Sequence, residues 1–80
     1  MIIGKVTDEC NICGSRVRDA RKKMKLSQDQ LAARLQTEGL GVNQNSVSRI
    51  ETGKRIVADF ELLALSKVLS VDISWLVQDE

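Results

Sequence analysis

The sequence predicts an all-α domain, because its composition disfavours a sheet and its apolar residues follow a helical spacing. The 80 residues contain no proline, five glycines and only two aromatic residues, Phe60 and Trp75. This composition lacks the density of turns and of β-forming residues that a small sheet protein needs. Apolar residues recur instead at spacings of three and four. We expect one domain at residues 12–77, with an N-terminal arm at 1–11 and a C-terminal end at 78–80.

The first predicted helix spans residues 12–25, with Asn11 as its N-terminal cap. Small or apolar residues mark its inner face: Cys13, Val17, Ala20 and Met24. A second helix starts at Gln28, because Ser27 can accept from the amide of Gln30 while the Gln30 side chain reaches back. We expect it to bury Leu31, Ala32 and Leu35 and to stop at Gly39.

The third predicted helix covers residues 44–52, between a cap at Asn43 and a left-handed stop at Gly53. Only Val47 and Ile50 are apolar in this segment. Most of its circumference must therefore face water or a polar partner.

Two further helices are predicted, at residues 59–69 and 73–77. The longer one should point Leu62, Leu65 and Leu69 inward, with Leu63 and Val68 widening the apolar stripe. Asp72 is expected to cap the short one, whose Trp75 and Leu76 should close the core.

Charge is distributed unevenly, although the net charge is only +1. Residues 16–55 hold ten Lys or Arg and four acids, whereas residues 56–80 are net acidic. Such a basic region suits an anionic partner. No apolar run approaches a membrane span and the start does not read as a secretory signal, so we expect a cytoplasmic protein without membrane contact.

Three segments in order, LSQDQLAARL, GVNQNSVSRIETGKR and ELLALSKVLSVDISWL, resemble the phage repressor and Cro family, or XRE-type helix-turn-helix regulators. The resemblance covers residues 12–77. It implies a five-helix lambda-repressor-like fold and a transcriptional regulator, more often a repressor, that binds double-stranded DNA. The helix at 44–52 would then be the recognition helix in the major groove.

The outward residues of that helix suit base recognition. Gln and Asn side chains pair with adenine and Arg pairs with guanine through two hydrogen bonds each. The expected base-contacting residues are Gln44, Asn45, Ser48 and Arg49. An ordinary solvated helix face is the alternative, although a face without acids is unusual for solubility alone.

Phosphate contacts are expected from the N-terminus of the second helix and from the segment after the third. The expected residues are Gln28, Asn43, Lys54 and Arg55. The resemblance further implies an inward ion pair between Arg21 and Glu51. That pairing would explain a carboxylate on a helix that faces DNA.

The chain departs from the family pattern at three places. Residues 36–40 lengthen the connection before the recognition helix, so the second helix either gains a turn or the connection loops out. The resemblance therefore does not fix the angle between these two helices, nor which side chain meets which base. Ala58 stands where Ser or Thr usually caps the fourth helix, a loss of about 1 kcal/mol. Ser70 replaces the common Gly after that helix.

Catalysis and metal binding are disfavoured by the residue types present. The chain has no His and two Cys, Cys10 and Cys13, so only a dimer sharing four thiolates could complete a zinc site. A redox switch is a second alternative, and a core role for Cys13 is the simplest. We expect neither an enzyme nor a cofactor or small-molecule ligand.

Two function classes remain open from sequence alone. One is a DNA-binding regulator, expected to act as a homodimer because one recognition helix offers a small contact area. Its expected interface consists of Val71, Ile73, Trp75 and Val77. The other is an antitoxin-like protein-interaction module that uses the same fold, a reading that the acidic C-terminal end slightly favours.

Overall fold

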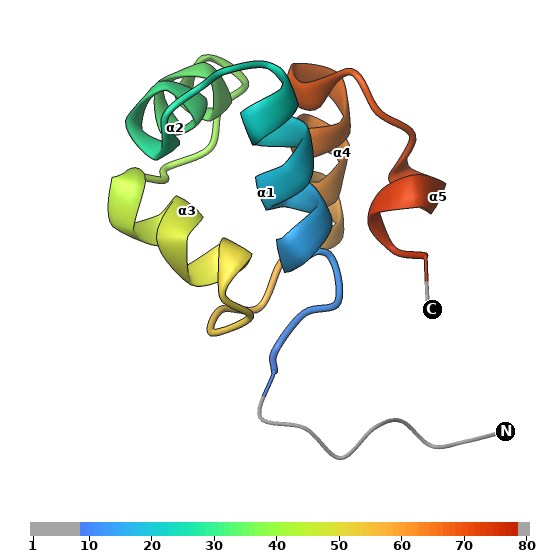
Figure 1. The fold of residues 1–80 in the computed structure, drawn as a ribbon. Helices are drawn as coiled ribbons and strands as arrows, with labels where there is room; N and C mark the ends of the chain where they lie inside the picture. Colours follow the sequence, from blue (N-terminus) through green and yellow to red (C-terminus); the bar gives the residue numbers. More distant parts are fainter. Residues whose placement is uncertain (1–8, 79–80) are drawn as a thin grey trace, which may run out of the picture.

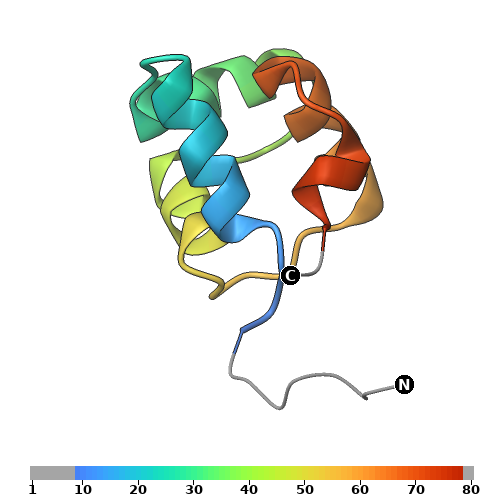
Figure 2. The same ribbon diagram turned by 45° about the vertical axis from the view of Figure 1, so that its right-hand side comes forward.

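The computed structural model describes residues 9–78 and contains five α-helices and no strand in that range. They are α1 (Gly14–Lys23), α2 (Gln28–Thr37), α3 (Gln44–Glu51), α4 (Asp59–Leu69) and α5 (Ile73–Leu76). Figure 1 shows α1 in the middle, with α2 and α3 on one side and α4 and α5 on the other, and the turn to Figure 2 brings α5 forward. α1 contacts α3, α4 and α5, and α2 contacts α3 and α4. The all-α, five-helix prediction is confirmed. Within residues 9–78, no helix is long and apolar enough to cross a bilayer.

α1 begins two residues later than predicted, and Asn11 explains the delay. Its Oδ1 accepts from the amide of Gly14 at 2.9 Å, so Asn11 does bind a helix-end amide as expected. Its Nδ2 donates to the carbonyls of Ile50 and Arg55, at 3.2 and 2.7 Å. These distant acceptors tie Asn11 to α3 and to the segment after it, and Cys13 is the N-cap residue of α1. The predicted arm before residue 9 and the last two residues lie outside the described range.

The predicted starts of α2 and α3 are confirmed. Gln30 N–H donates to Ser27 Oγ at 3.0 Å, and Ser27 N–H donates to Gln30 Oε1 at 2.8 Å. Asn43 and Ser46 make the same reciprocal arrangement at the start of α3. Each helix thereby satisfies amides that have no partner within the first turn.

The lengthened connection after α2 combines both predicted alternatives. The helix continues to Thr37, and the chain then turns through Gly39, whose φ is +93°. Leu40 N–H donates to Leu35 O at 3.2 Å, which closes a Schellman turn. The Gln36 side chain donates to Val42 O at 2.7 Å. The extra residues are therefore fixed by their own hydrogen bonds.

The helices enclose one core, in which each of α1 to α5 buries apolar side chains. The largest fully buried ones are Leu31, Leu35, Ile50, Leu65, Leu76, Val17 and Val47. The prediction for α4 is partly wrong: Leu63 is 48% exposed, whereas Ala64 and Glu61 are buried. Leu62 and Val68 are only partly buried against the core, and Met24 is 36% exposed. α4 turns a narrower face inward than the apolar stripe suggested.

Hydrogen bonds compensate the two unusual helix ends around α4. Ala58 has no side-chain acceptor, but its own amide donates to Glu61 Oε1 at 2.9 Å. Ser70 adopts the left-handed conformation that Gly usually takes, at φ +57°, and Ser66 O accepts from the next amide, that of Val71. The predicted cap at Asp72 is wrong in one respect, because its side chain makes no capping hydrogen bond.

Gly14 allows α1 to touch the end of α3. It is buried, and a Cβ at this position would overlap the carbonyl oxygen of Ile50 and approach that of Glu51 at 3.0 Å. Both are backbone atoms, so no side chain can move aside. Only glycine allows the two helices to approach this closely.

Gly14→Ala is therefore expected to lower the free energy of unfolding by about 1–3 kcal/mol through overpacking. Gly41→Ala is the matched control, since a Cβ there meets nothing within 4 Å. We expect Gly41→Ala to be neutral or stabilising, because alanine restricts the unfolded chain. Urea unfolding monitored by circular dichroism measures both, and equal midpoints for the two variants would contradict the close approach of α1 and α3.

Candidate nucleic-acid interface

The outer face of α3 carries the four residues that were predicted to contact bases. Val47 and Ile50 are buried and attach the helix to the core. The opposite side holds Gln44, Asn45, Ser48 and Arg49, of which all but the partly buried Ser48 are exposed. The Arg49 guanidinium makes one long hydrogen bond, 3.4 Å from Nη2 to Lys54 O. The face therefore combines amide, hydroxyl and guanidinium groups without a free carboxylate.

A chain of hydrogen bonds runs from this face to α1. Gln44 Nε2 donates to Gln28 Oε1 at 2.6 Å, and Gln28 Nε2 donates to Glu51 Oε1 at 3.1 Å. The bond to Gln28 leaves the Gln44 amide with its carbonyl oxygen and one N–H for another partner. The side chain of Gln28, a residue predicted to contact phosphate, reaches from α2 to two residues of α3.

Arg21 and Glu51 form the ion pair that the family resemblance implied. Arg21 Nε lies 2.6 Å from Glu51 Oε2, and Arg21 Nη2 lies 3.0 Å from Glu51 Oε1. The side chains are 11% and 2% exposed, and Arg21 Nη1 also donates to Leu26 O at 2.8 Å. The hydrogen bonds to Glu51 raise the pKa of Arg21 above its ordinary value. Glu51 therefore points inward, away from the outer face of α3.

The predicted phosphate-binding residues differ in how far their side chains are already hydrogen-bonded within the protein. Lys54 is exposed in the turn after α3, where Gly53 has a φ of +75° and the Lys54 amide donates to Arg49 O at 2.8 Å. The Asn43 side chain is exposed but its Oδ1 is occupied by the cap of α3. The side chain of Gln28 is engaged as described above, which leaves its amide at the start of α2.

Arg55 is bound by Glu61, a pairing that the sequence analysis missed. Nη1 and Nη2 lie 3.0 and 2.9 Å from the two carboxylate oxygens. Hydrogen bonding from Arg55 lowers the pKa of Glu61, and the same bond raises the pKa of Arg55. The pair thus stabilises the fold above the carboxyl pKa of the unfolded chain, and this contribution is lost as pH falls through the lower, folded pKa. A phosphate contact from Arg55 must compete with Glu61.

The two cysteines are free thiols in different environments. Cys10 is exposed, with its amide donating to Gly53 O at 2.7 Å, and Cys13 is a core residue with 2% exposure. Burial raises the pKa of the Cys13 thiol, which lowers its reactivity. Residues 9–78 contain no group of three or more potential metal ligands.

Together, these features define a helix-turn-helix: a capped helix with a polar outer face lies across a preceding helix whose N-terminus adjoins that face. The Helix-turn-helix family model matches residues 17–76, so the chain belongs to this family of XRE-type helix-turn-helix proteins. Among solved structures, the P22 c2 repressor protein in complex with synthetic operator 9T in the presence of Tl⁺ is similar. It shares 30% identity with a TM-score of 0.73, over 88% of this chain and 98% of that chain. A search of curated proteins finds no match.

Arg21→Ala and Glu51→Ala test the structural role of the inward ion pair. Removing one partner leaves the other charge buried, so each variant is expected to lose about 3–5 kcal/mol of stability. Lys22→Ala is the control, because this exposed neighbour should change stability by no more than about 0.5 kcal/mol. Thermal melts without DNA measure the stability of all three variants. Unchanged melting temperatures for both Arg21→Ala and Glu51→Ala would show that the ion pair does not stabilise the fold.

Proposed function

We propose that this chain is a sequence-specific double-stranded DNA-binding transcriptional regulator, with α3 in the major groove and repression as its action. The observation that carries the proposal is the outer face of α3, where Gln44 is oriented by Gln28 and the only carboxylate of the helix is paired inward. Its membership in the helix-turn-helix family and its similarity to the operator-bound P22 c2 repressor support the same function.

Base recognition would rest on α3. Gln44 keeps one N–H and one oxygen available, the arrangement that an adenine edge requires. Arg49 suits guanine, and Asn45 and Ser48 complete the set with further amide and hydroxyl groups. Since Gln28 fixes the Gln44 amide, less rotational freedom is lost on binding.

Phosphate contacts would position the protein without reading sequence. The amide of Gln28 lies at the positive N-terminal end of α2, where helices attract anions. Lys54 and Asn43 lie at the two ends of α3. Arg55 would contribute to the extent that phosphate replaces Glu61.

The alternative, a protein-interaction module, differs in its response to salt. A DNA binder releases counterions and loses affinity steeply as salt rises, whereas a pure protein binder has no such affinity for random duplex DNA. The family and the fold are those of DNA-binding regulators and favour the first class. Selection of bound sites from a random duplex pool would identify the operator.

Arg49→Ala is expected to relax base preference at one or two positions of the selected site, because it removes a base-edge contact. Lys54→Ala should instead weaken binding to all sequences about equally and lower the salt slope by about one unit. Fluorescence anisotropy on the selected and on a random duplex distinguishes the two effects. An unchanged preferred site for Arg49→Ala would mean that α3 docks with another side.

Binding as a homodimer is also proposed, although the structure changes the argument for its interface. Val71, Trp75 and Val77, three of the four predicted interface residues, pack partly buried against the core of the same chain. Ile73 remains 37% exposed on α5. Among the described residues, Ile56, three residues before α4, and Phe60, in the first turn of α4, are exposed to larger fractions, 72% and 63%.

The selected operator is therefore expected to contain two half-sites about 34 Å apart. Ile73→Asp should reduce cooperative occupancy of the two half-sites without shifting the melting temperature. Phe60→Asp, which also replaces an exposed residue, is the comparison in the same gel-shift titration. Loss of cooperativity in Phe60→Asp alone would move the interface to α4, and a single unrepeated site occupied by one protomer would exclude the dimer.

A further inference from the structure

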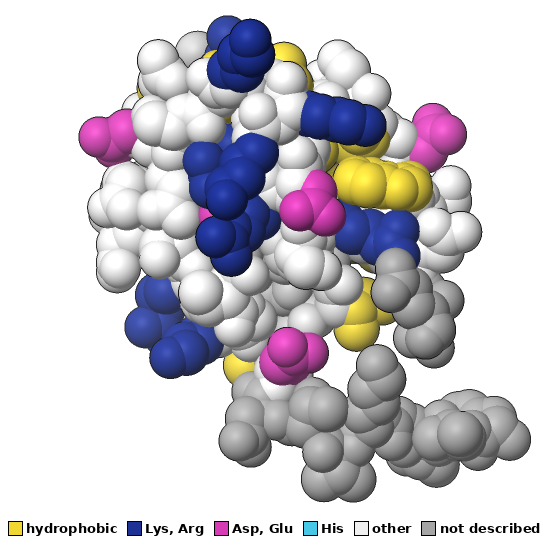
Figure 3. All heavy atoms as spheres, viewed as in Figure 1, with side chains coloured by type: hydrophobic (Ala, Val, Ile, Leu, Met, Phe, Trp, Pro, Cys, Tyr) yellow, Lys and Arg dark blue, Asp and Glu magenta, His cyan; other side chains and the backbone are white. Residues whose placement is uncertain are grey.

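α1 and the turn after it carry four exposed cations that none of the features above uses: Arg18, Lys22, Lys23 and Lys25. Arg18, Lys22 and Lys25 are exposed, and none of them forms an ion pair with another residue of the described range. Figure 3 shows Lys and Arg side chains gathered over the face that α1 presents in this view. A row of unpaired cations suits a polyanion.

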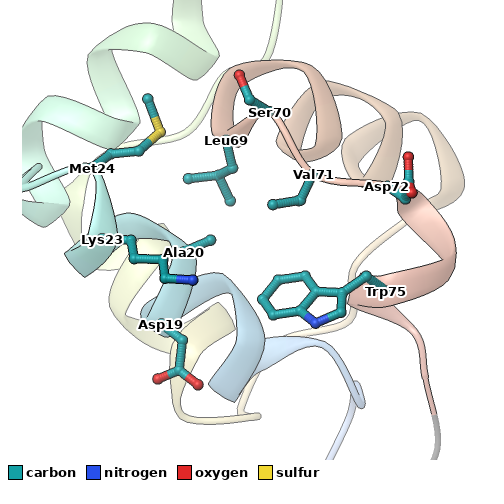
Figure 4. Close-up of a pocket in the computed structure, with 9 residues that line it drawn as sticks. All are labelled: Asp19, Ala20, Lys23, Met24, Leu69, Ser70, Val71, Asp72 and Trp75. Carbon is teal, nitrogen blue, oxygen red and sulfur yellow. The ribbon is translucent and has the colours of Figure 1, made fainter.

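Arg18 and Lys22 are four residues apart and therefore share one stripe of α1, and Lys25 follows in the turn after the helix. Arg21 defines the side of α1 that is turned toward α3, because its guanidinium reaches Glu51 on α3. Arg18 lies one helical turn before Arg21, so the stripe formed by Arg18 and Lys22 borders the side that faces α3. The other side of α1 faces away from α3. There Asp19, Ala20, Lys23 and Met24 line a groove beside Trp75 and the end of α4, into which the Trp75 ring points in Figure 4.

Lys25 occupies a backbone position that favours glycine. Its φ is +58°, and the turn closes with Leu26 N–H donating to Arg21 O at 3.1 Å and Lys25 N–H donating to Lys22 O at 2.9 Å. This is the Schellman end at which glycine is the usual residue, because a Cβ is strained in the left-handed region. A lysine there costs stability, and such strain is characteristic of positions with a functional role.

The same turn adjoins the proposed DNA face. Leu26 O accepts from Arg21 Nη1 at 2.8 Å, so the corner between α1 and α2 is fixed to the ion pair. Gln28 lies three residues after Lys25 and contacts both Gln44 and Glu51. Lys25 therefore lies in the turn that leads directly into the N-terminus of α2.

We propose that Arg18, Lys22 and Lys25 form a second line of phosphate contacts that extends the DNA interface along α1, an inference that rests on the proposed function. The row binds the DNA backbone without reading bases, since it lies outside the recognition helix. Lys25 is the residue nearest to α2, and its charge outweighs the strain of its backbone.

The test is the salt dependence of duplex binding by Arg18→Gln, Lys22→Gln and Lys25→Gly, with Lys23→Gln as the matched control on the groove side. Each of the first three should lower the slope of log affinity against log salt by about 0.9. The control should leave the slope unchanged. Preference between the selected and random duplexes should stay the same in all four variants.

Lys25→Gly separates binding from folding. Glycine relieves the left-handed strain, so the urea midpoint should stay the same or rise while DNA binding weakens. If the wild type shows a steep fall of log affinity with log salt and the three variants show the same slope, this inference is overturned while the proposed function is supported. A wild-type protein without salt-dependent duplex binding would overturn both.

Discussion

The buried ion pair between Arg21 and Glu51 is the interaction on which the rest of this structure depends. It joins α1 to α3, and through Gln28 and the carbonyl of Leu26 it also fixes the start of α2. A buried charge must be paired and fully hydrogen-bonded to be tolerated. Both Glu51 oxygens accept hydrogen bonds, and the Arg21 guanidinium donates to Glu51 and to the carbonyl of Leu26. The pair therefore sets the relative positions of three helices that a small apolar core alone would leave less constrained.

Local signals made most of the fold predictable. Ser27, Asn43, Gly39 and Gly53 act through bonds to residues three to five positions away, so their effect is visible in the sequence. The start of α1 was missed for the opposite reason. Asn11 is held by the carbonyls of Ile50 and Arg55, which follow it in the sequence by 39 and 44 residues. No local sequence pattern reveals such distant partners.

The same distinction applies to the core and to the site. An apolar stripe shows which residues can be buried, but neighbouring helices decide how wide a face is covered, and α4 leaves Leu63 exposed. At the candidate interface, residue types and helix spacing identified the outer face of α3. The bonds from Gln28 to Gln44 and from Arg55 to Glu61 join separate segments through polar side chains. Their geometry is determined only when the helices are packed, so sequence reasoning assigned Gln28 and Arg55 to phosphate alone.

The extra residues between α2 and α3 show why a site can tolerate change next to it. From sequence alone, these residues left the angle between the two helices open. They form a closed turn of their own, fixed by Leu40 N–H to Leu35 O and by Gln36 to Val42 O. Gln44 Nε2 donates to Gln28 Oε1 at 2.6 Å at the start of α3, and Glu51 pairs with Arg21 at its other end. Because these bonds join the N-terminus of α2 directly to both ends of α3, the angle between the helices is set by the polar chain and the core rather than by the length of the connection. A loop that supplies its own hydrogen bonds makes no demand on those contacts. Its insertion costs mainly loop entropy, which grows slowly with length.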